Sequence, residues 1–111
     1  MTVAEMVEQL GLQVRAGTGR LDRPVTGGHV GDLLSSVMAK SAQGQVWVTI
    51  QSHPNIVAVA ALLELAVIIV VEGVEPEPAT LARAQEQGVT VLTTTMGAFE
   101  TVGKLYQLGV H

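Results

Sequence analysis

The 111 residues are enough for one compact domain with a single core, but too few for two independent domains. Hydrophobic residues make up 48% of the chain and aromatic residues only 3%, so the core must be aliphatic, which favours a β-rich sheet covered by helices of small residues. Scattered charges with a net value of −4 disfavour nucleic-acid binding, and the lack of cysteine excludes disulfides, thiolate catalysis and cysteine-ligated zinc while being compatible with the cytoplasm.

The first predicted element is a short amphipathic helix. Thr2 and Glu5 have the spacing of a capping box, and apolar residues recur at helical intervals until Gly11. Its composition, with no basic region or long apolar run, does not predict a signal peptide. The residues from Leu12 to Ala16 alternate between apolar and polar and predict a strand. A loop from Gly17 to Pro24 follows, and it leads to a Thr-Gly-Gly run that we expect just before a helix.

The next elements are a helix, a strand and a second helix. We expect the first helix to be opened or capped by Asp32 and to end near Gly44. Its apolar residues are Leu33, Leu34, Val37 and Met38. The β-branched and aromatic run from Val46 to Ile50 predicts a strand. The helix from Pro54 to Leu65 is apolar almost all round, so we expect no side of it to face water: part should pack on the sheet and part on a second subunit.

An unbroken aliphatic run from Ala66 to Val71 is typical of a central parallel strand with both faces covered. The longer apolar stretch that contains it, Ile56 to Val71, includes Glu64 and is too short to span a membrane. A polar helix from Thr80 to Gln87 and a strand from Val89 to Leu92 are predicted next.

The last helix is expected to end at Gly109 and to turn four side chains toward the core, namely Phe99, Val102, Leu105 and Tyr106. Strands alternating with helices indicate right-handed βαβ units, so the predicted fold is an α/β three-layer sandwich with a mostly parallel central sheet flanked by helices. Because the carboxyl ends of parallel strands share one edge, the turns after three strands should gather there. These turns are Gln51–Asn55, Glu72–Glu75 and Thr93–Gly97.

The segment DRPVTGG, from Asp22 to Gly28, joins a charged pair, a rigid turn, a hydroxyl and two glycines. A glycine pair lets the main chain approach a ligand closely, so the segment is either an anion-binding loop or a structural turn held by an Asp–Arg pair. It lacks the lysine of a phosphate-binding P-loop. The longest basic grouping, formed by Arg15, Arg20 and Arg23, could hold one small anion.

Two further positions offer anion ligands. His53 stands where a strand gives way to a helix, and Thr93 to Thr95 offer hydroxyls before the last helix, with ordinary capping as the alternative for both. No nucleophile or carboxylate has motif spacing to His53, and the three histidines have no metal-ligand spacing, so neither catalytic residues nor a metal site are predicted. The candidate ligand-binding residues are Asp22, Arg23, Thr26, Gly27, Gly28, His53, Thr94 and Thr95.

Four stretches together resemble the DRTGG domain family: DRPVTGG, GGHVGDLLSSVMA, VWVTIQSHPNIVAVAALLELAVIIVVEG and GVTVLTTTMGAFETVGKLY. The resemblance runs from about Gly11 to Tyr106, with Pro24-Val25 inserted into the signature. It implies one DRTGG domain over residues 1–111, similar in fold to the N-terminal domain of HPr kinase and without the kinase P-loop. Members usually sit inside larger proteins, between CBS domains of pyrophosphatases or beside phosphotransacetylase domains, and the resemblance implies a regulatory or accessory role, often in a dimer.

These observations favour a non-enzymatic regulatory module without a cofactor. We expect a homodimer that binds a small anionic ligand, such as a nucleotide, or a partner protein. Two alternatives remain open: a scaffold that binds only a protein, and a phosphate-handling enzyme, which would need His53, Asp32 or Arg23 in a shared pocket. Neither a nucleic acid nor a membrane is expected as a partner.

Overall fold

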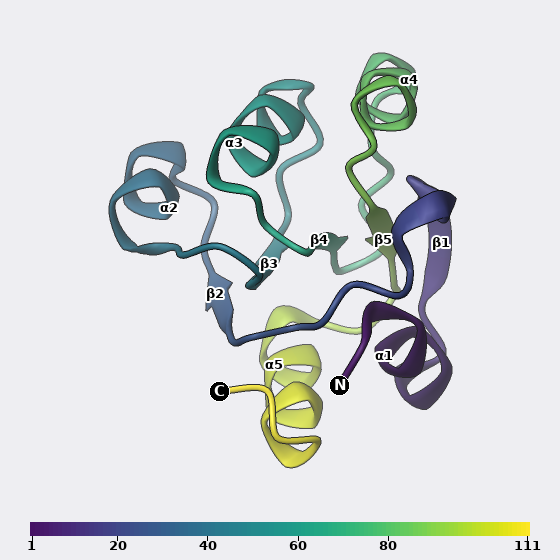
Figure 1. Cartoon of the computed structure of the whole chain (residues 1–111), viewed down its shortest axis with the longest axis vertical. Coiled ribbons are helices and arrows are strands. Elements are labelled where there is room, and N and C mark those ends of the chain that lie inside the picture. The colour runs from purple at the N-terminus through teal and green to yellow at the C-terminus, as the bar shows by residue number, and fades with distance from the viewer.

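The computed structural model describes all residues, Met1 to His111. The helices are α1 (Val3–Leu10), α2 (Leu34–Lys40), α3 (Asn55–Leu63), α4 (Pro78–Gln87) and α5 (Ala98–Gln107). The strands are β1 (Gln13–Ala16), β2 (Gly28–Val30), β3 (Val46–Thr49), β4 (Val67–Val70) and β5 (Val91–Thr93), and a short 3-10 helix, Thr18–Arg20, follows β1. Helices lie on both sides of one sheet (Figure 1), so the predicted α/β three-layer sandwich is confirmed. None of the helices has both the length and the apolar composition to cross a membrane.

The order of the strands explains which helices cover each face of the sheet. The order is β1-β5-β4-β3-β2; strands β2 to β5 are parallel, and β1 runs antiparallel beside β5. Every crossover between parallel strands therefore moves in the same direction. The helices of these crossovers are α2, α3 and α4, and they lie on one face because the crossovers share one hand. The first and last helices, α1 and α5, lie on the other face (Figure 1). We call these the three-helix face and the two-helix face.

The centre of the core is formed by β3 and β4, whose residues are all buried. The aliphatic run of β4 has both faces covered, which confirms its prediction as a central strand. Its neighbouring residues Ile68 and Ile69 belong to separate buried clusters, one under each layer of helices. Trp47 is the largest buried side chain and belongs to the cluster of the three-helix face.

Several predicted helix ends are confirmed. Thr2 caps α1: its Oγ1 accepts a hydrogen bond from the Glu5 N–H at 3.2 Å, and the Glu5 carboxylate accepts one from the Thr2 N–H at 3.1 Å. Gly11 and Gly88 end α1 and α4 in the left-handed conformation that glycine adopts without strain. The α4 helix starts earlier than predicted, at Pro78, because proline suits the first helical position.

The β2 strand was not predicted from the sequence. We expected a helix directly after the Thr-Gly-Gly run, but the run continues into β2 at the edge of the sheet. Hydrogen bonds from the Thr26 N–H to the Gly44 carbonyl and from the Val46 N–H to the Gly27 carbonyl, both 2.9 Å, align this segment with β3. A strand of three residues is too short to show the alternation that predicts strands.

The prediction for Asp32 is also wrong. Its Oδ1 accepts hydrogen bonds from the Thr49 Oγ1 and the Ile50 N–H, both at 2.8 Å, and thereby joins the end of β2 to the end of β3. The α2 helix consequently has no side-chain cap, and it ends at Lys40, before the predicted end near Gly44.

Within one chain, α3 buries one side of its surface, as expected for the part that packs on the sheet, and leaves another side exposed. It spans Asn55–Leu63 rather than Pro54 to Leu65 and packs between α2 and α4. Its outward residues include Ala58, Ala61 and Leu62, of which only Leu62 is a large exposed side chain. Alanine exposes little apolar area, so this side can face water at low cost. The contact of this helix with a second subunit stays a prediction.

The orientation of α5 corrects another prediction. Of the four side chains expected in the core, Leu105 is buried and Val102 is partly buried, but Phe99 is 95% exposed and Tyr106 is 64% exposed. A helix on one face of a sheet buries a single stripe of its surface. Thr101 and Leu105 occupy that stripe here, which leaves Phe99 and Tyr106 on the outer side.

Candidate functional site

The Asp22–Gly28 segment crosses the amino ends of the parallel strands on its way to β2 (Figure 1). Thr26 of this segment makes hydrogen bonds within the chain: its Oγ1 donates to the Gln43 carbonyl at 3.0 Å, and its N–H donates to the Gly44 carbonyl. Gly44 has a φ of +83°, and a Cβ there would lie 2.7 Å from the Thr26 Oγ1. Only glycine fits this position, so Thr26 and Gly44 form a close structural turn.

Arg23 fastens this segment to the end of α3. Its Nη1 donates to the Leu65 carbonyl at 3.0 Å, and its Nη2 donates to the Glu64 carbonyl at 3.3 Å. A cation is favourable there because the last carbonyls of a helix lack partners within the helix. Asp22 is exposed and does not pair with Arg23, since the ion pairs of the structure are Arg15–Glu75 and Lys104–Glu100. The Asp–Arg pair considered for this turn is therefore absent.

The same segment touches both ends of the chain. The Val25 N–H donates to the Met1 carbonyl at 2.8 Å. Gly27 is buried, and a Cβ on it would lie 3.6 Å from the His111 carbonyl oxygen. Gly28 already belongs to β2. Gly27 is thus packed beside the carboxyl end of the chain, whereas Gly28 is exposed.

The other candidate residues lie at the opposite ends of the parallel strands, where the predicted gathering of three turns is confirmed. We call the side where these strands begin the amino edge and the side where they end the carboxyl edge. The Gly73 N–H donates to the Thr94 carbonyl at 3.0 Å, and the Glu77 N–H donates to the Ser52 carbonyl at 3.1 Å. His53 is exposed, and its Nδ1 accepts a hydrogen bond from a backbone N–H at the start of α3, as a capping residue does. The candidate ligand-binding residues therefore form two groups at opposite edges and not one site.

A polar pocket of about 300 Å³ lies at this second edge. It is lined by Gly11, Gln13, Arg15, Gly73, Val74, Glu75, Thr93, Thr94 and Thr95, and we call it the carboxyl-edge pocket. Antiparallel pairing sets Gln13 opposite Thr93, which brings β1 to the edge where the parallel strands end. The sequence indicated Thr94 and Thr95, and it named Arg15 only in a grouping with Arg20 and Arg23, from which the structure separates it. It did not indicate that Gln13 and Arg15 lie beside these threonines, because the neighbour of β1 cannot be read from the residues of β1.

The charged pair of this pocket is Arg15 and Glu75. The Arg15 Nη1 donates to the Glu75 Oε1 at 2.8 Å, and Nη2 donates to Oε2, which makes the contact bidentate. The hydrogen bonds from the guanidinium lower the pKa of Glu75 below its usual value, and the carboxylate raises the pKa of Arg15. The Arg15 side chain is 22% exposed and that of Glu75 is 65% exposed. The pocket thus holds a fixed cation whose partner lies mostly in solvent.

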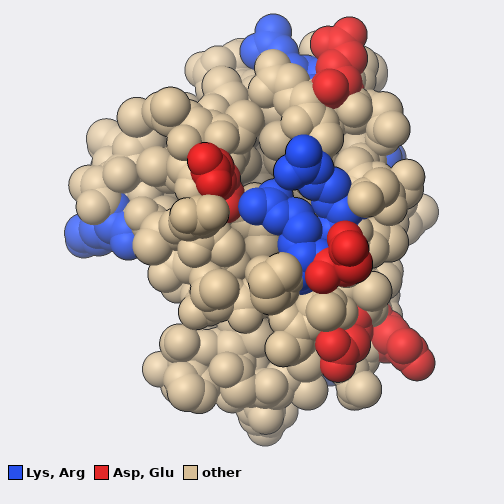
Figure 2. Space-filling view, viewed as in Figure 1, with Lys and Arg blue, Asp and Glu red and all other residues tan.

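A second cationic position lies at the amino edge. Figure 2 shows basic side chains side by side in the middle of this face. A cleft of about 240 Å³ there is lined by Arg20, Arg23 and residues at the ends of α3 and α4. The guanidinium of Arg20 lies close to Gly88, the residue that ends α4. Both arginines therefore stand at helix carboxyl termini, where a cation complements the helix dipole.

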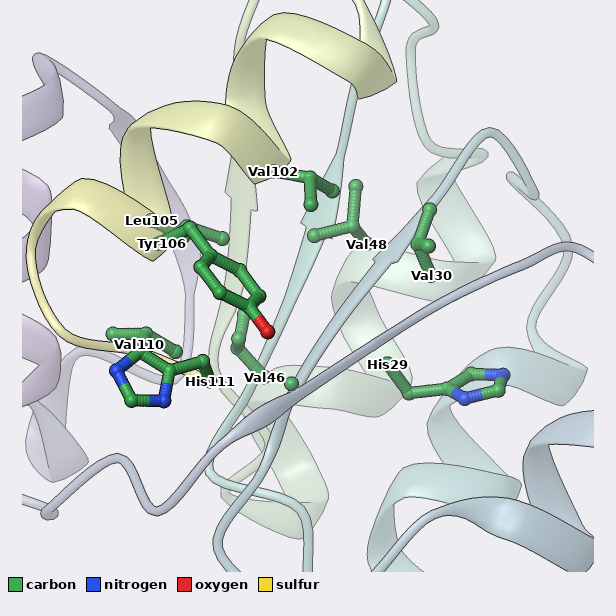
Figure 3. A pocket seen from close by; sticks show the side chains of 10 residues that line it. His29, Val30, Val46, Val48, Val102, Leu105, Tyr106, Val110 and His111 are labelled. Carbon is green, nitrogen blue, oxygen red and sulfur yellow. The ribbon is translucent and has the colours of Figure 1, made fainter.

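An apolar hollow of about 200 Å³ lies on the two-helix face, between the β2–β3 edge and α5 (Figure 3). Its lining residues are Gly28, His29, Val30, Val46, Val48, Val102, Leu105, Tyr106, Val110 and His111. The rings of Tyr106 and His111 are 5.0 Å apart, whereas the ring of His29 points away from the hollow (Figure 3). This hollow suits an apolar group rather than an anion.

The three residues named for the alternative of a phosphate-handling enzyme lie at two different edges. Arg23 lies at the amino edge, whereas His53 and Asp32 lie at the carboxyl edge, so the three residues cannot share one pocket. No three His, Asp or Glu side chains come together in a way that could hold a metal ion.

The fold and these sites define a small three-layer α/β domain with ligand-sized hollows. The sequence matches the DRTGG domain family over residues 5–108, and the chain belongs to this family. Its fold is similar to that of the CBS and DRTGG domains of the regulatory region of Clostridium perfringens pyrophosphatase, whose crystal structure contains the activator diadenosine tetraphosphate. The TM-score is 0.74 at 18% sequence identity, and the match covers 92% of this chain but 44% of the other. No curated protein matches the sequence significantly.

Proposed function

We propose that this chain is a non-enzymatic, cytoplasmic regulatory module that binds a small anionic ligand, such as a nucleotide, in the carboxyl-edge pocket and acts as a homodimer. The observation that carries the proposal is the arginine of this pocket. Arg15 is fixed on β1, faces a group of threonines and has a mostly exposed glutamate as its present partner.

The chemistry of the pocket supports a phosphate group as the anion. A guanidinium binds the paired oxygens of a carboxylate and of a phosphate with the same bidentate geometry. The Glu75 carboxylate therefore marks where an anionic oxygen pair sits on Arg15. Thr93, Thr95 and Gln13 line the same pocket, and their hydroxyl and amide groups are able to donate to further oxygens.

The family supports the regulatory part of the proposal. The similar structure is a regulatory region that contains a DRTGG domain and is complexed with a nucleotide activator. Since the identity between the two chains is 18%, we carry over only the class of ligand, a phosphate compound that regulates. The particular nucleotide of the pyrophosphatase is one probe among several.

A second candidate function is a scaffold that binds only a partner protein. The observation that favours it is the pair of exposed aromatic side chains, Phe99 and Tyr106, since protein interfaces are enriched in such residues. This alternative predicts that no phosphate compound changes the stability of the chain.

Calorimetric and thermal-shift titrations with phosphate, pyrophosphate, ATP and diadenosine tetraphosphate test the proposal. We expect saturable binding of at least one compound without turnover. Arg15→Ala should weaken this binding roughly 10- to 150-fold, because hydrogen bonds to charged groups contribute about 1.5–3 kcal/mol. Arg20→Ala is the matched control, since it removes an exposed arginine from the opposite edge.

Three results would overturn the proposal. If no compound binds and a stoichiometric protein companion is recovered, the chain is a scaffold. If Arg20→Ala rather than Arg15→Ala weakens binding, the ligand lies at the amino edge, in the cleft that Arg20 shares with Arg23. If the purified chain turns over a phosphate compound and His53→Ala abolishes the turnover, the chain is an enzyme.

A further inference from the structure

The outer side of α5 exposes two of the three aromatic side chains of this protein. Phe99 and Tyr106 are 95% and 64% exposed, while Trp47 is buried. Val30, on the adjoining edge strand β2, is 50% exposed. Grouped apolar side chains of this size on a protein surface usually mark an interaction site. We call this surface the α5 patch, and its residues are Val30, Ala98, Phe99, Val102, Gly103 and Tyr106.

The α5 patch contains both a projection and a hollow. Phe99 and Tyr106 are two helical turns apart on the same side of α5, and Gly103 lies between them. A Cβ on Gly103 would meet no other heavy atom within 4 Å, and an apolar hollow of about 420 Å³ lies beside this glycine. Phe99 forms part of the wall of the hollow and projects into solvent, so an aromatic ring from another molecule has room to enter.

A second copy of the chain carries the matching shape. A two-fold axis perpendicular to α5 and close to Gly103 places two α5 helices antiparallel. Phe99 of one protomer then comes beside Tyr106 of the other and enters the hollow next to the other Gly103. The same contact forms a second time across the axis, because a two-fold interface makes every contact twice.

The charges on α5 are also complementary to a second copy. Glu100 and Lys104 lie on one flank of the helix, with 3.5 Å between the Glu100 Oε2 and the Lys104 Nζ. The two-fold axis keeps this flank against the equivalent flank of the other protomer, with the helix direction reversed. Glu100 of each protomer therefore faces Lys104 of the other, so that opposite charges meet across the interface.

We infer that the α5 patch is the surface through which two copies of this chain associate. The inference rests on the homodimer of the proposed function, and it locates the contact on α5 instead of α3. A buried aromatic side chain contributes about 150–250 Å². Two such rings on each protomer, with Val30 and a polar rim, reach the low end of specific interfaces, about 1,000 Å² in total. The dimer is therefore weak, and its population depends on concentration.

Sedimentation velocity over about 5 to 500 µM measures this association. We expect a monomer–dimer equilibrium that Phe99→Glu weakens by about 100-fold or more, since it places a charge in the centre of the interface. Leu62→Glu is the matched control: it adds the same charge at the one large exposed side chain of α3 and should change the dissociation constant less than about three-fold. Far-ultraviolet circular dichroism verifies that both variants are folded.

The outcomes separate this inference from the homodimer itself. A dimer that survives Phe99→Glu but dissociates with Leu62→Glu overturns the α5 patch and keeps the homodimer on α3. A wild-type chain that is monomeric over the whole concentration range overturns both. Neither result bears on the phosphate titrations, which report on a different edge of the sheet.

Exchange of the α5 charges distinguishes a second copy from any other partner. Glu100→Lys and Lys104→Glu each place like charges across the two-fold axis, so each variant alone should dimerise several-fold more weakly than the wild type. An equimolar mixture of the two variants restores opposite charges at both contacts and should recover the wild-type affinity. A mixture no stronger than either variant alone contradicts the antiparallel α5 arrangement.

Discussion

The two faces of the sheet receive different numbers of helices, and the difference determines where the surface stays open. Three helices close one face, so that Trp47 and Ile56 beneath them are 0% and 1% exposed. Two helices cover the same five strands on the other face and leave the apolar hollow beside β2 together with the α5 patch. Because the strand order sends every crossover in one direction, an incompletely covered face follows from the topology itself.

The variant with the largest expected effect on the free energy of unfolding tests how completely helices close the three-helix face. Trp47→Ala removes a buried indole whose Nε1 donates to the Gly31 carbonyl at 2.8 Å, and it should lower the free energy of unfolding by about 3–5 kcal/mol. Tyr106→Ala truncates an aromatic ring on the two-helix face and should cost less than about 0.5 kcal/mol in the monomer. Urea denaturation followed by circular dichroism measures both. Equal losses would mean that the two faces are equally closed.

Enlarging a side chain on each face sharpens the comparison. Val70 belongs to the closed cluster of the three-helix face, and Val48 lines the apolar hollow. Val70→Ile should lower the free energy of unfolding by about 1–3 kcal/mol through overpacking. Val48→Ile should leave it unchanged or raise it by up to about 0.8 kcal/mol, because the added methylene enters empty space. Destabilisation by Val48→Ile as large as that by Val70→Ile would show that the hollow is not available to side chains.

Removing the cap of α1 tests how far the two-helix face depends on this helix. Thr2→Ala removes the Oγ1 that accepts the hydrogen bond from the Glu5 N–H, while the bond from the backbone N–H of residue 2 to the Glu5 carboxylate remains, and it should cost about 1 kcal/mol. Thr18→Ala, at an exposed threonine of the 3-10 helix, is the control and should stay within about 0.5 kcal/mol of the wild type. Thermal unfolding together with hydrogen exchange of the α1 amides reports the loss. Unchanged exchange in Thr2→Ala would contradict the role of the cap.

The smallest expected effect concerns acid and the carboxyl-edge pocket. Arg15 lowers the pKa of Glu75 below 4.5, so the stability from this ion pair is fully present above about pH 4.5 and is lost as the pH falls through the folded-state pKa. Glu75→Gln should therefore flatten the acid limb of a plot of melting temperature against pH, and added salt should shrink the difference between the two proteins. An NMR titration of the Glu75 carboxyl with a pKa at or above 4.5 would show that the pair does not persist in solution.

The elements that were predicted correctly can be recognised from their own residues. The capping box of Thr2 and Glu5 fixes the start of α1, and the unbroken run of β4 requires cover on both faces whatever its neighbours are. The gathering of turns at the carboxyl edge follows from parallel pairing alone. Each of these inferences needs only local pattern or a general rule of topology.

The features that were missed depend on partners elsewhere in the chain. β2 exists because Gly27 and Thr26 pair with the start of β3, and Arg15 joins the carboxyl-edge pocket because β1 lies antiparallel to β5. The rotation of α5 was wrongly predicted because Phe99 and Leu105 are both apolar, so the sequence pattern alone does not show which stripe meets the sheet. Such choices are decided by packing between distant segments.

The contacts of Val25 with Met1 and of Gly27 with His111 bring both termini to one short stretch of backbone. A domain with adjacent ends is readily inserted into a loop of a larger protein. The same stretch is joined to the start of the central strand, because Arg23 donates a hydrogen bond to the Leu65 carbonyl, two residues before β4. The stretch on which the family resemblance rests thus lies beside both ends of the domain.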